Sequence, residues 1–299
     1  MSENEKTHPN FKYSLLMMLA ALIWGSAFVA QRVGMDFLGP YTFNCVRSFI
    51  GCLALAPVIL TLGRRGAATQ FATRAGRREL LVGGVVCGAI LTVSTLFQQI
   101  GLKYTTAGKA GFITAQYILL VPIFGLAIGK RASWLLWVAV AVALCGMYLL
   151  CVKDGLKIEK GDLYVFCCAI CFSCHILFID HFVQKVDAFL LSCLQFAVCG
   201  LLSGILMFIV ETPSVSGILK GWVPILYTGI LSSGVAYTLQ IITQKHLSAA
   251  IAALVMSLES VFAALTGWII LHENLSAREF IGCVLVFAAT LLAQMPARR

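Results

Sequence analysis

Charged side chains are what this sequence lacks most. Asp, Glu, Lys and Arg make up 12% of its 299 residues, whereas a typical soluble chain holds about 25%. Acidic residues are especially few, at 13. This scarcity excludes a nucleic-acid-binding module, a disordered regulator and a secreted disulfide-rich domain. What remains is a chain that is 60% hydrophobic, with a mean hydropathy of +0.92. Such a composition is typical of a membrane protein with several spans.

Stretches without charge recur along the chain and are long enough to span a bilayer. A transmembrane helix needs about 20 mostly apolar residues, whereas a barrel strand alternates polar and apolar residues over about ten positions. The windows here are continuous apolar runs, which favours helices. We therefore expect an all-α membrane protein with ten transmembrane helices, over residues 13–31, 48–63, 80–102, 110–129, 132–152, 163–179, 188–210, 221–244, 246–272 and 280–297.

The loops differ in their content of Lys and Arg, which accumulate on the cytoplasmic side of membrane proteins. Loops on the same side as the two termini hold most of these residues, and the segment 64–78 alone holds five. We expect both termini in the cytoplasm, and the compact chain suggests a bacterial inner membrane. The net charge of +9 then reflects topology and contact with the lipid bilayer. It does not suggest a nucleic-acid partner.

Most of the 12 cysteines lie inside the expected spans, where they are expected to pack as small buried hydrophobic residues. One cluster invites a second interpretation, because Cys167, Cys168, Cys171 and Cys174 precede His175 with a spacing that could suggest a metal site. On a continuous helix, however, these thiols spread over a wide arc, and no second ligand pair occurs elsewhere. We favour helix packing and expect no metal and no cofactor.

Two segments of the chain resemble each other at a constant offset of 142 residues. Residues 106–125 align with residues 248–267 in their order of small and apolar residues. The same offset pairs Gln98 with Gln240. The shared order of these matches predicts an internal repeat.

The repeat has five helices in each copy, and its two copies are expected at residues 1–152 and 153–299. Because five is an odd number, the second copy must enter the membrane from the opposite side, so the repeats are inverted. The polar segment Lys153–Gly161 joins them. In transporters built this way the substrate site lies near the membrane midplane, between the two repeats.

Several motifs make a family resemblance specific. They are WGSAFV at 24–29, Arg47 in the second helix, QIGLKYTTAGKAG at 99–111 and SLESVFAALTGWIILHENLS at 257–276. On these motifs the chain resembles the EamA family of the drug/metabolite transporter superfamily. Ser260 stands where this family usually has proline. The first half departs further, at Ile118–Leu119 and near Arg131. The resemblance implies a ten-helix carrier, often an exporter of amino acids, metabolites or drugs, with a central cavity lined by both halves.

Glu259 is the sharpest single feature, because it lies close to the expected midplane of its span. A charge at that depth is unfavourable by several kcal/mol unless it is paired or protonated. In the functional interpretation, Glu259 binds a cationic group or carries a proton coupled to substrate movement. In the structural interpretation, it is a hydrogen-bonding group between helices. The repeat position opposite Glu259 is Tyr117.

Other polar and aromatic residues are candidates for substrate contact. The aromatic candidates could stack with a planar substrate, although single aromatic residues in membrane helices more often only pack. His175 could relay protons, or it could be a neutral imidazole bonded between helices. The substrate-binding candidates are Trp24, Ser26, Tyr117, His175, Tyr237 and Glu259.

A second group of polar residues is expected nearer the two membrane faces. Arg47 could act as a gate or as a counter-charge for carboxylates, although snorkelling of its side chain to the interface is the favoured alternative. Lys109 has the same two interpretations. The glutamines suit one gate on each face, or plain interfacial anchoring. The gating candidates are Arg47, Gln98, Gln99 and Gln240.

Three classes of function remain in view. A secondary transporter that moves a small metabolite (an amino acid, amine or drug-like compound) by alternating access fits best, with export implied by the resemblance and proton coupling as an option. An intramembrane enzyme acting on lipid or peptide would need paired aspartates, a metal set or a Ser–His dyad at matched depth. A channel or receptor fits an inverted repeat less well. No nucleotide-binding loop is present, so the energy source must be a gradient. The carrier is expected to be a monomer or a homodimer.

Overall fold

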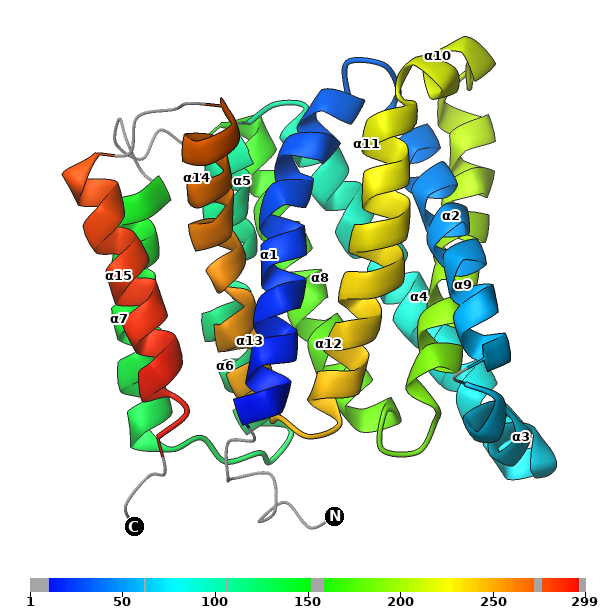
Figure 1. Cartoon of the computed structure of the whole chain (residues 1–299), viewed down its shortest axis with the longest axis horizontal. Coiled ribbons are helices and arrows are strands. Elements are labelled where there is room, and N and C mark those ends of the chain that lie inside the picture. Colours follow the sequence, from blue (N-terminus) through cyan, green and yellow to red (C-terminus); the bar gives the residue numbers. More distant parts are fainter. Residues whose placement is uncertain (1–10, 62, 106, 152–158, 272–275, 296–299) are drawn as a thin grey trace.

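The computed structural model describes residues 11–61, 63–105, 107–151, 159–271 and 276–295. Its elements are helical and run in roughly parallel columns (Figure 1). They are α1 Phe11–Gly34, α2 Pro40–Thr61, α3 Arg64–Ala72, α4 Arg74–Leu102, α5 Ala107–Thr114, α6 Tyr117–Ala127, α7 Trp134–Cys151, α8 Lys160–Phe182, α9 Ala188–Val210, α10 Val215–Lys220, α11 Trp222–Leu226, the π-helix η2 Tyr227–Ala236, α12 Tyr237–Gln244, α13 Ala249–Met256, α14 Leu258–Leu271 and α15 Ala277–Leu292.

Nine helices in the described ranges are long and apolar enough to cross a membrane. The expected multi-pass, all-α architecture is therefore present, whereas ten spans are not confirmed within the described residues. The window 280–297 was expected to form the last span. It corresponds to α15, which has only 16 residues. At 1.5 Å per residue, α15 is about 24 Å long, which is shorter than the hydrocarbon core of about 30 Å.

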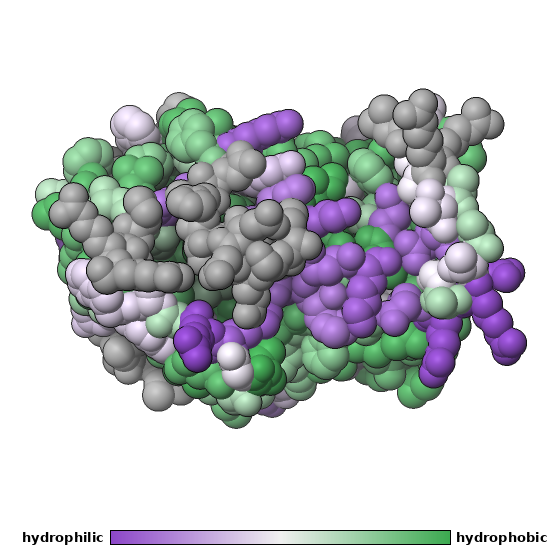
Figure 2. Space-filling model, turned by 90° about the horizontal axis from the view of Figure 1, so that it is seen from below, coloured by the Kyte–Doolittle hydropathy of each residue, from purple (hydrophilic) through white to green (hydrophobic). Residues whose placement is uncertain are grey.

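The helices form a bundle whose two ends differ. The beginning of α1 and the end of α15 lie at the lower end in Figure 1, together with α3. We call this end the termini end. α2 packs along α9, α4 along α8 and α9, α7 along α15, and α1 along α14 and η2. The termini end gathers hydrophilic side chains between rims of hydrophobic ones (Figure 2). The exposed basic residues Arg74, Arg77, Arg78, Lys185 and Lys245 belong to it. The joint at 152–158 and residues 272–275 of the family motif lie outside the described residues.

The beginnings of several helices are fixed by polar side chains that accept hydrogen bonds from the first-turn amides. Asp187 accepts from the amides of Phe189 and Leu190 at the start of α9. Ser248 does the same for α13, and Ser276 for α15. Such caps stabilise a helix by about 1 kcal/mol each.

The start of α2 is capped by a residue from far along the chain. Glu211, at the end of α9, accepts hydrogen bonds from the backbone amides of Tyr41 (3.1 Å) and Thr42 (2.9 Å) and from the Thr42 hydroxyl (2.6 Å). Gly39 makes room for this carboxylate, because a Cβ at that position would collide with Glu211. The negative charge also suits the positive end of the α2 dipole.

Three columns depart from α-helical geometry midway along their length. A two-residue turn at Ala115–Gln116 separates α5 from α6, and one residue, Ser257, separates α13 from α14. At the first break the bonding tightens, since the amides of Gln116 and Ile118 bond three residues back, at 3.1 Å and 3.0 Å. The third departure is the ten-residue π-helix η2. Tightened turns and π segments inside helices often mark hinges and functional sites.

Candidate functional site

A buried cavity lies where these irregular segments meet. It has a volume of about 40 Å³, enough for about three water molecules. Residues from both halves of the chain surround it. Its walls are formed by Trp24, Phe28, Gln31, Arg47, Gln98, Thr114, Tyr117, Phe172, Ser232, Tyr237, Gln240, Met256 and Glu259.

Glu259 and Tyr117 form a direct pair in the wall of the cavity. The Tyr117 hydroxyl donates to Oε1 of Glu259 at 2.8 Å. Glu259 is in the first turn of α14, just past the break at Ser257, and Tyr117 begins α6, just past the break at Ala115–Gln116. The side chains are 5% and 2% exposed, so each depends on the other for a polar partner.

Arg47 is buried, and the favoured expectation that it snorkels to the interface is wrong. It is 4% exposed and lies within α2, which begins at Pro40 rather than at 48. Its Nε donates to Oδ1 of Asn44 at 3.0 Å, and its Nη1 donates to Oε1 of Gln31 at 3.1 Å. These bonds hold the guanidinium at the cavity instead of letting it reach the membrane surface.

Lys109 also pairs within the protein, but its side chain is 21% exposed, and snorkelling to the interface stays a prediction for this residue. Its Nζ lies 2.7 Å from Oδ2 of Asp162.

Residues separated by the expected repeat offset meet at the cavity. Gln98 and Gln240 both line it, as do Thr114 and Met256, and Tyr117 and Glu259. Gln98 donates toward the Thr114 hydroxyl at 3.5 Å, and Gln240 donates to Oε1 of Gln244 at 2.9 Å. Both glutamines are buried and are in the wall of one cavity.

Aromatic rings form one side of the cavity. Tyr237 contacts Trp24 edge-on, with ring centroids 4.9 Å apart, and meets Phe196 at 5.2 Å. Two polar atoms of the wall, Nε1 of Trp24 and Oε1 of Gln240, have no hydrogen-bond partner among the described residues. A buried polar group without a partner is unfavourable.

Three sequence-predicted residues do not line the cavity. Ser26 hydrogen-bonds the Tyr227 hydroxyl and the carbonyls of its own helix. His175 is fully buried, and its Nε2 lies 3.0 Å from Oε1 of Gln195 on α9. Gln99 donates to the carbonyl of Gln31 at 3.3 Å. Ser26 and Gln99 thus join helices, and His175 matches the bonded-imidazole interpretation.

The cavity also contains residues that sequence reasoning missed. Phe28 follows Trp24 by four residues, and Gln31 follows Phe28 by three, so all three lie along one face of α1. Helical periodicity could therefore have found Phe28 and Gln31. Thr114 and Met256 were available through the repeat offset. Phe172 and Ser232 carry no local signal, because they stand among many similar residues in apolar helices. The missed residues are Phe28, Gln31, Thr114, Phe172, Ser232 and Met256.

The cysteine cluster is dispersed over the surface of α8. Cys168 is fully buried, whereas Cys167, Cys171 and Cys174 are only partly buried. In the described part of the chain, no group of three or more His, Cys, Asp or Glu side chains is placed to hold a metal ion. The expectation of helix packing for these thiols agrees with this arrangement.

Comparison with known proteins places the whole chain among transporters. It is 29% identical over 289 residues to an uncharacterized transporter of Archaeoglobus fulgidus, covering 93% of this chain and 84% of that one. It is 21% identical over 282 residues to the uncharacterized transporter YoaV of Bacillus subtilis, covering 92% and 94%. One solved crystal structure shares the fold with a TM-score of 0.79 at 18% identity, covering 95% of this chain and 97% of the other.

The family model gives the assignment. The model of the EamA-like transporter family matches twice, over residues 11–152 and 159–295. These two matches together cover most of the chain, and the apolar helices agree with a membrane protein. The resemblance expected from the sequence motifs is therefore confirmed. The chain is a multi-pass membrane protein that belongs to the EamA-like transporter family.

Proposed function

We propose that the protein carries a small metabolite across the membrane by alternating access. One observation supports this most strongly: the wall of the cavity takes residues from both halves of the chain. In carriers built from inverted repeats, the substrate binds at the repeat interface and the halves rock around it. We take the repeats to be 1–152 and 153–299, in line with the two family matches and the residue pairs that meet at the cavity.

The chemistry of the wall favours a small polar substrate such as an amino acid or an amine. Arg47 can bind a carboxylate, and Glu259 can bind an ammonium group or carry a proton. The rings of Trp24 and Tyr237 add a surface for the apolar part of the substrate. At about 40 Å³ the cavity is far smaller than typical ligand pockets of about 300–1,000 Å³. The helices around the cavity must therefore separate to admit a substrate of this kind.

Glu259 is the candidate for proton coupling, because it is the only acidic residue among the described residues that line the cavity. One pH unit supplies about 1.4 kcal/mol per proton, which corresponds to about a tenfold substrate gradient. A single acid would thus sustain modest transport against a gradient.

Orientation follows from the distribution of charge. We place the termini end in the cytoplasm of a bacterial cell and the helices in its inner membrane, because Arg74, Arg77 and Arg78 are exposed at that end. Transport is then directed toward the opposite face, as the family resemblance implies. We take one chain as the transport unit, since one chain supplies the whole cavity wall, and a homodimer would hold two separate cavities.

Counterflow in proteoliposomes tests the proposal. The protein would be offered a mixed panel of amino acids, amines, nucleosides and planar drugs, with and without a pH gradient, and uptake would be read by mass spectrometry. Wild type would be compared with Glu259→Gln and with the matched control Glu79→Gln, which changes a half-exposed carboxylate away from the cavity.

The outcomes separate the roles of Glu259. If exchange survives Glu259→Gln but no longer responds to the gradient, Glu259 carries the coupled proton. If exchange and coupling are lost together in a folded variant, Glu259 binds substrate. If folded wild type exchanges no member of the panel, the small-metabolite proposal is contradicted.

A further inference from the structure

The column formed by α5 and α6 is tied to α8 by an ion pair at each of its ends. Lys109, in α5, pairs with Asp162 near the start of α8. Lys130, just after α6, pairs with Asp180 near the end of α8. The two aspartates are thus at opposite ends of one helix, and the two lysines are at opposite ends of the column that packs against it.

The pair at the end away from the termini is part of a compact polar cluster. Nζ of Lys109 lies 2.7 Å from Oδ2 of Asp162 and 3.7 Å from Oε2 of Glu159. The Thr105 hydroxyl donates to Oδ1 of Asp162 at 2.8 Å. Asp162 is largely buried, with 8% of its side chain exposed. The cluster therefore fastens the beginning of α5 to the beginning of α8.

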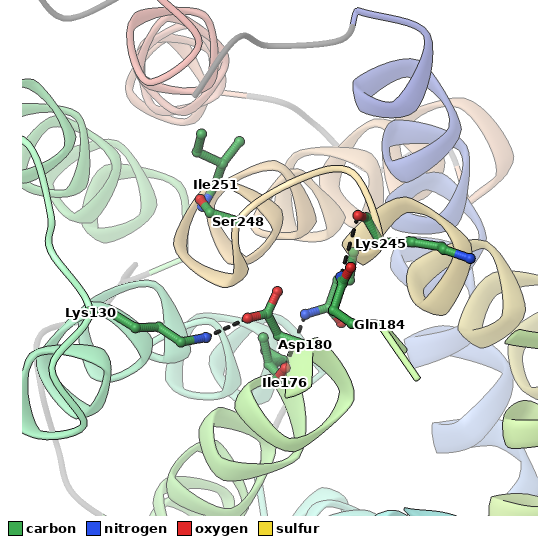
Figure 3. Close-up of polar contacts among 8 residues, drawn as sticks. Lys130, Ile176, Asp180, Gln184, Lys245, Ser248 and Ile251 are labelled. Carbon is green, nitrogen blue, oxygen red and sulfur yellow. Dashed lines mark hydrogen bonds and ion pairs between the residues drawn. The ribbon is translucent and has the colours of Figure 1, made fainter. Parts of the chain in front are cut away.

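The pair at the termini end connects the two halves of the chain. Lys130 reaches Asp180 across the gap between the α6–α7 turn and α8 (Figure 3). On the other side of α8, Gln184 donates to the carbonyl of Lys245 at 3.4 Å, and Gln244 donates to the carbonyl of Ile176 at 3.0 Å. The end of α8 thus bonds to the α6–α7 turn of the first half and to the α12–α13 turn of the second.

A point of bending lies between the two pairs. The break at Ala115–Gln116 divides the column into α5, which carries Lys109, and α6, which ends just before Lys130. Thr114 and Tyr117, which flank the break, both line the cavity. A tightened turn in a helix can act as a hinge, so either half of the column can swing away from α8 while the other half stays bound.

The corresponding column of the second half has a different chemistry. At the repeat offset, the apolar Ile251 of α13 stands where the first half has Lys109. α14 packs on α1 through the backbone of Gly25 rather than through charges, since a Cβ there would lie 2.5 Å from the carbonyl oxygen of Glu259. In the described residues, paired charges thus fasten the α5–α6 column.

We propose that Lys109–Asp162 and Lys130–Asp180 are the two latches of the transport cycle, one for each face of the membrane. Opening the cavity to one face breaks the pair at that face and bends the column at Ala115–Gln116, while the other pair stays closed. The inference rests on the proposed alternating access. Both pairs are formed in this structure, which agrees with the small volume of its cavity.

Hydrogen exchange of the protein in lipid nanodiscs tests the latches without a substrate. Two sets of amides are compared: residues 126–131 and 244–248 at the termini end, and residues 107–111 and 159–163 at the opposite end. Lys130→Ala removes one latch, so it is expected to speed exchange at the termini end about tenfold. The same variant is expected to slow exchange at the opposite end, because the population moves away from states open there. Lys109→Ala is expected to give the mirror image.

Two controls keep the test decisive. Lys185→Ala removes a lysine that lies 3.8 Å from Glu79 at the termini end, and it is expected to leave both sets of amides unchanged. The exchanged pair Lys130→Asp with Asp180→Lys is expected to restore the wild-type pattern even if either single change misfolds. Faster exchange only at the mutated end, or at both ends, would contradict the latches.

Transport measured on the same variants separates the two proposals. Reciprocal exchange in folded variants without counterflow of any panel member would uphold the latches and contradict the proposed substrate class. Normal counterflow with no reciprocal exchange would uphold the carrier and contradict the latches.

Discussion

The Tyr117 hydroxyl donates to the Glu259 carboxyl at 2.8 Å across a separation of 142 residues in sequence. This separation equals the offset at which the two halves of the chain align. The same position in each half has thus become a donor in one and an acceptor in the other. The bond joins α6 to α14 in the wall of the cavity, so any movement that opens the cavity must stretch or exchange it.

Replacing Tyr117 with Phe tests the strength of this pair. The change removes the donor and leaves a buried carboxyl without its partner, which is expected to lower the free energy of unfolding by about 1–3 kcal/mol. Thermal unfolding in detergent measures the effect. The matched control is Tyr227→Phe, which removes a hydroxyl bonded to the partly buried Ser26 and should destabilise less. Equal losses for the two variants would argue against a special role for the Tyr117–Glu259 bond.

Arg47 is expected to tolerate no substitution by lysine. Its guanidinium bonds Asn44 through Nε and Gln31 through Nη1, and a lysine ammonium cannot reproduce this planar, two-sided geometry. Arg47→Lys should lower counterflow of carboxylate-bearing panel members about tenfold. The exposed Arg278, which lies over the Tyr148 ring, provides the control Arg278→Lys, for which we expect no change in transport.

Gly25 is expected to be needed for the contact between α1 and α14. A Cβ at position 25 would lie 2.5 Å from the carbonyl oxygen of Glu259 and 2.8 Å from the amide nitrogen of Ala263. Because both atoms are backbone, Gly25→Ala must push the helices apart, and we expect a loss of about 1–3 kcal/mol in unfolding free energy. At Gly111 the added Cβ would only approach Ser260 Oγ, at 3.9 Å, so Gly111→Ala should be neutral or stabilising. Similar melting temperatures for both variants would contradict this packing.

Two thiols report on the contact between α2 and α9. The sulfur atoms of Cys52 and Cys193 lie 3.4 Å apart. Mild oxidation with copper phenanthroline should therefore join them, with loss of two protons to the solvent and transfer of two electrons to the oxidant. Intact-mass and peptide spectrometry would identify the disulfide. Cys52→Ser should abolish it, whereas a dominant crosslink through the exposed Cys145 would show that the helices pack differently.

Much of the fold could be predicted because apolar runs of sufficient length have few alternatives to a membrane helix. Charged residues, however, do not always indicate where a span begins or ends. A buried, hydrogen-bonded arginine interrupts a charge-free stretch, and for this reason the second charge-free window begins at 48, whereas α2 begins at Pro40. Local hydrogen bonds allow a charged side chain to be buried inside a membrane helix, so a charge does not always mark the end of a span.

The candidate site was predictable where repetition gave a signal. The offset of 142 residues related Gln98 to Gln240 and Tyr117 to Glu259, and all four line the cavity. Helical periodicity also indicates that Ser26 faces away from Trp24, because two residues correspond to a rotation of about 200° around the helix axis. The Ser26 hydroxyl meets Tyr227 instead. The π-helix η2 could not be predicted from the sequence, because a change in hydrogen-bond register within an apolar stretch requires no particular residue type.

The cap on α2 has a consequence for the assembly of the protein in the membrane. Glu211 follows Tyr41 and Thr42 by 170 and 169 residues. The ribosome therefore delivers α2 long before the carboxylate that satisfies its first amides. Until α9 has been inserted, those amides must rely on water or lipid headgroups. The start of α2 is thus completed only when a later helix arrives, so docking of α9 against α2 forms part of biogenesis as well as of the finished bundle.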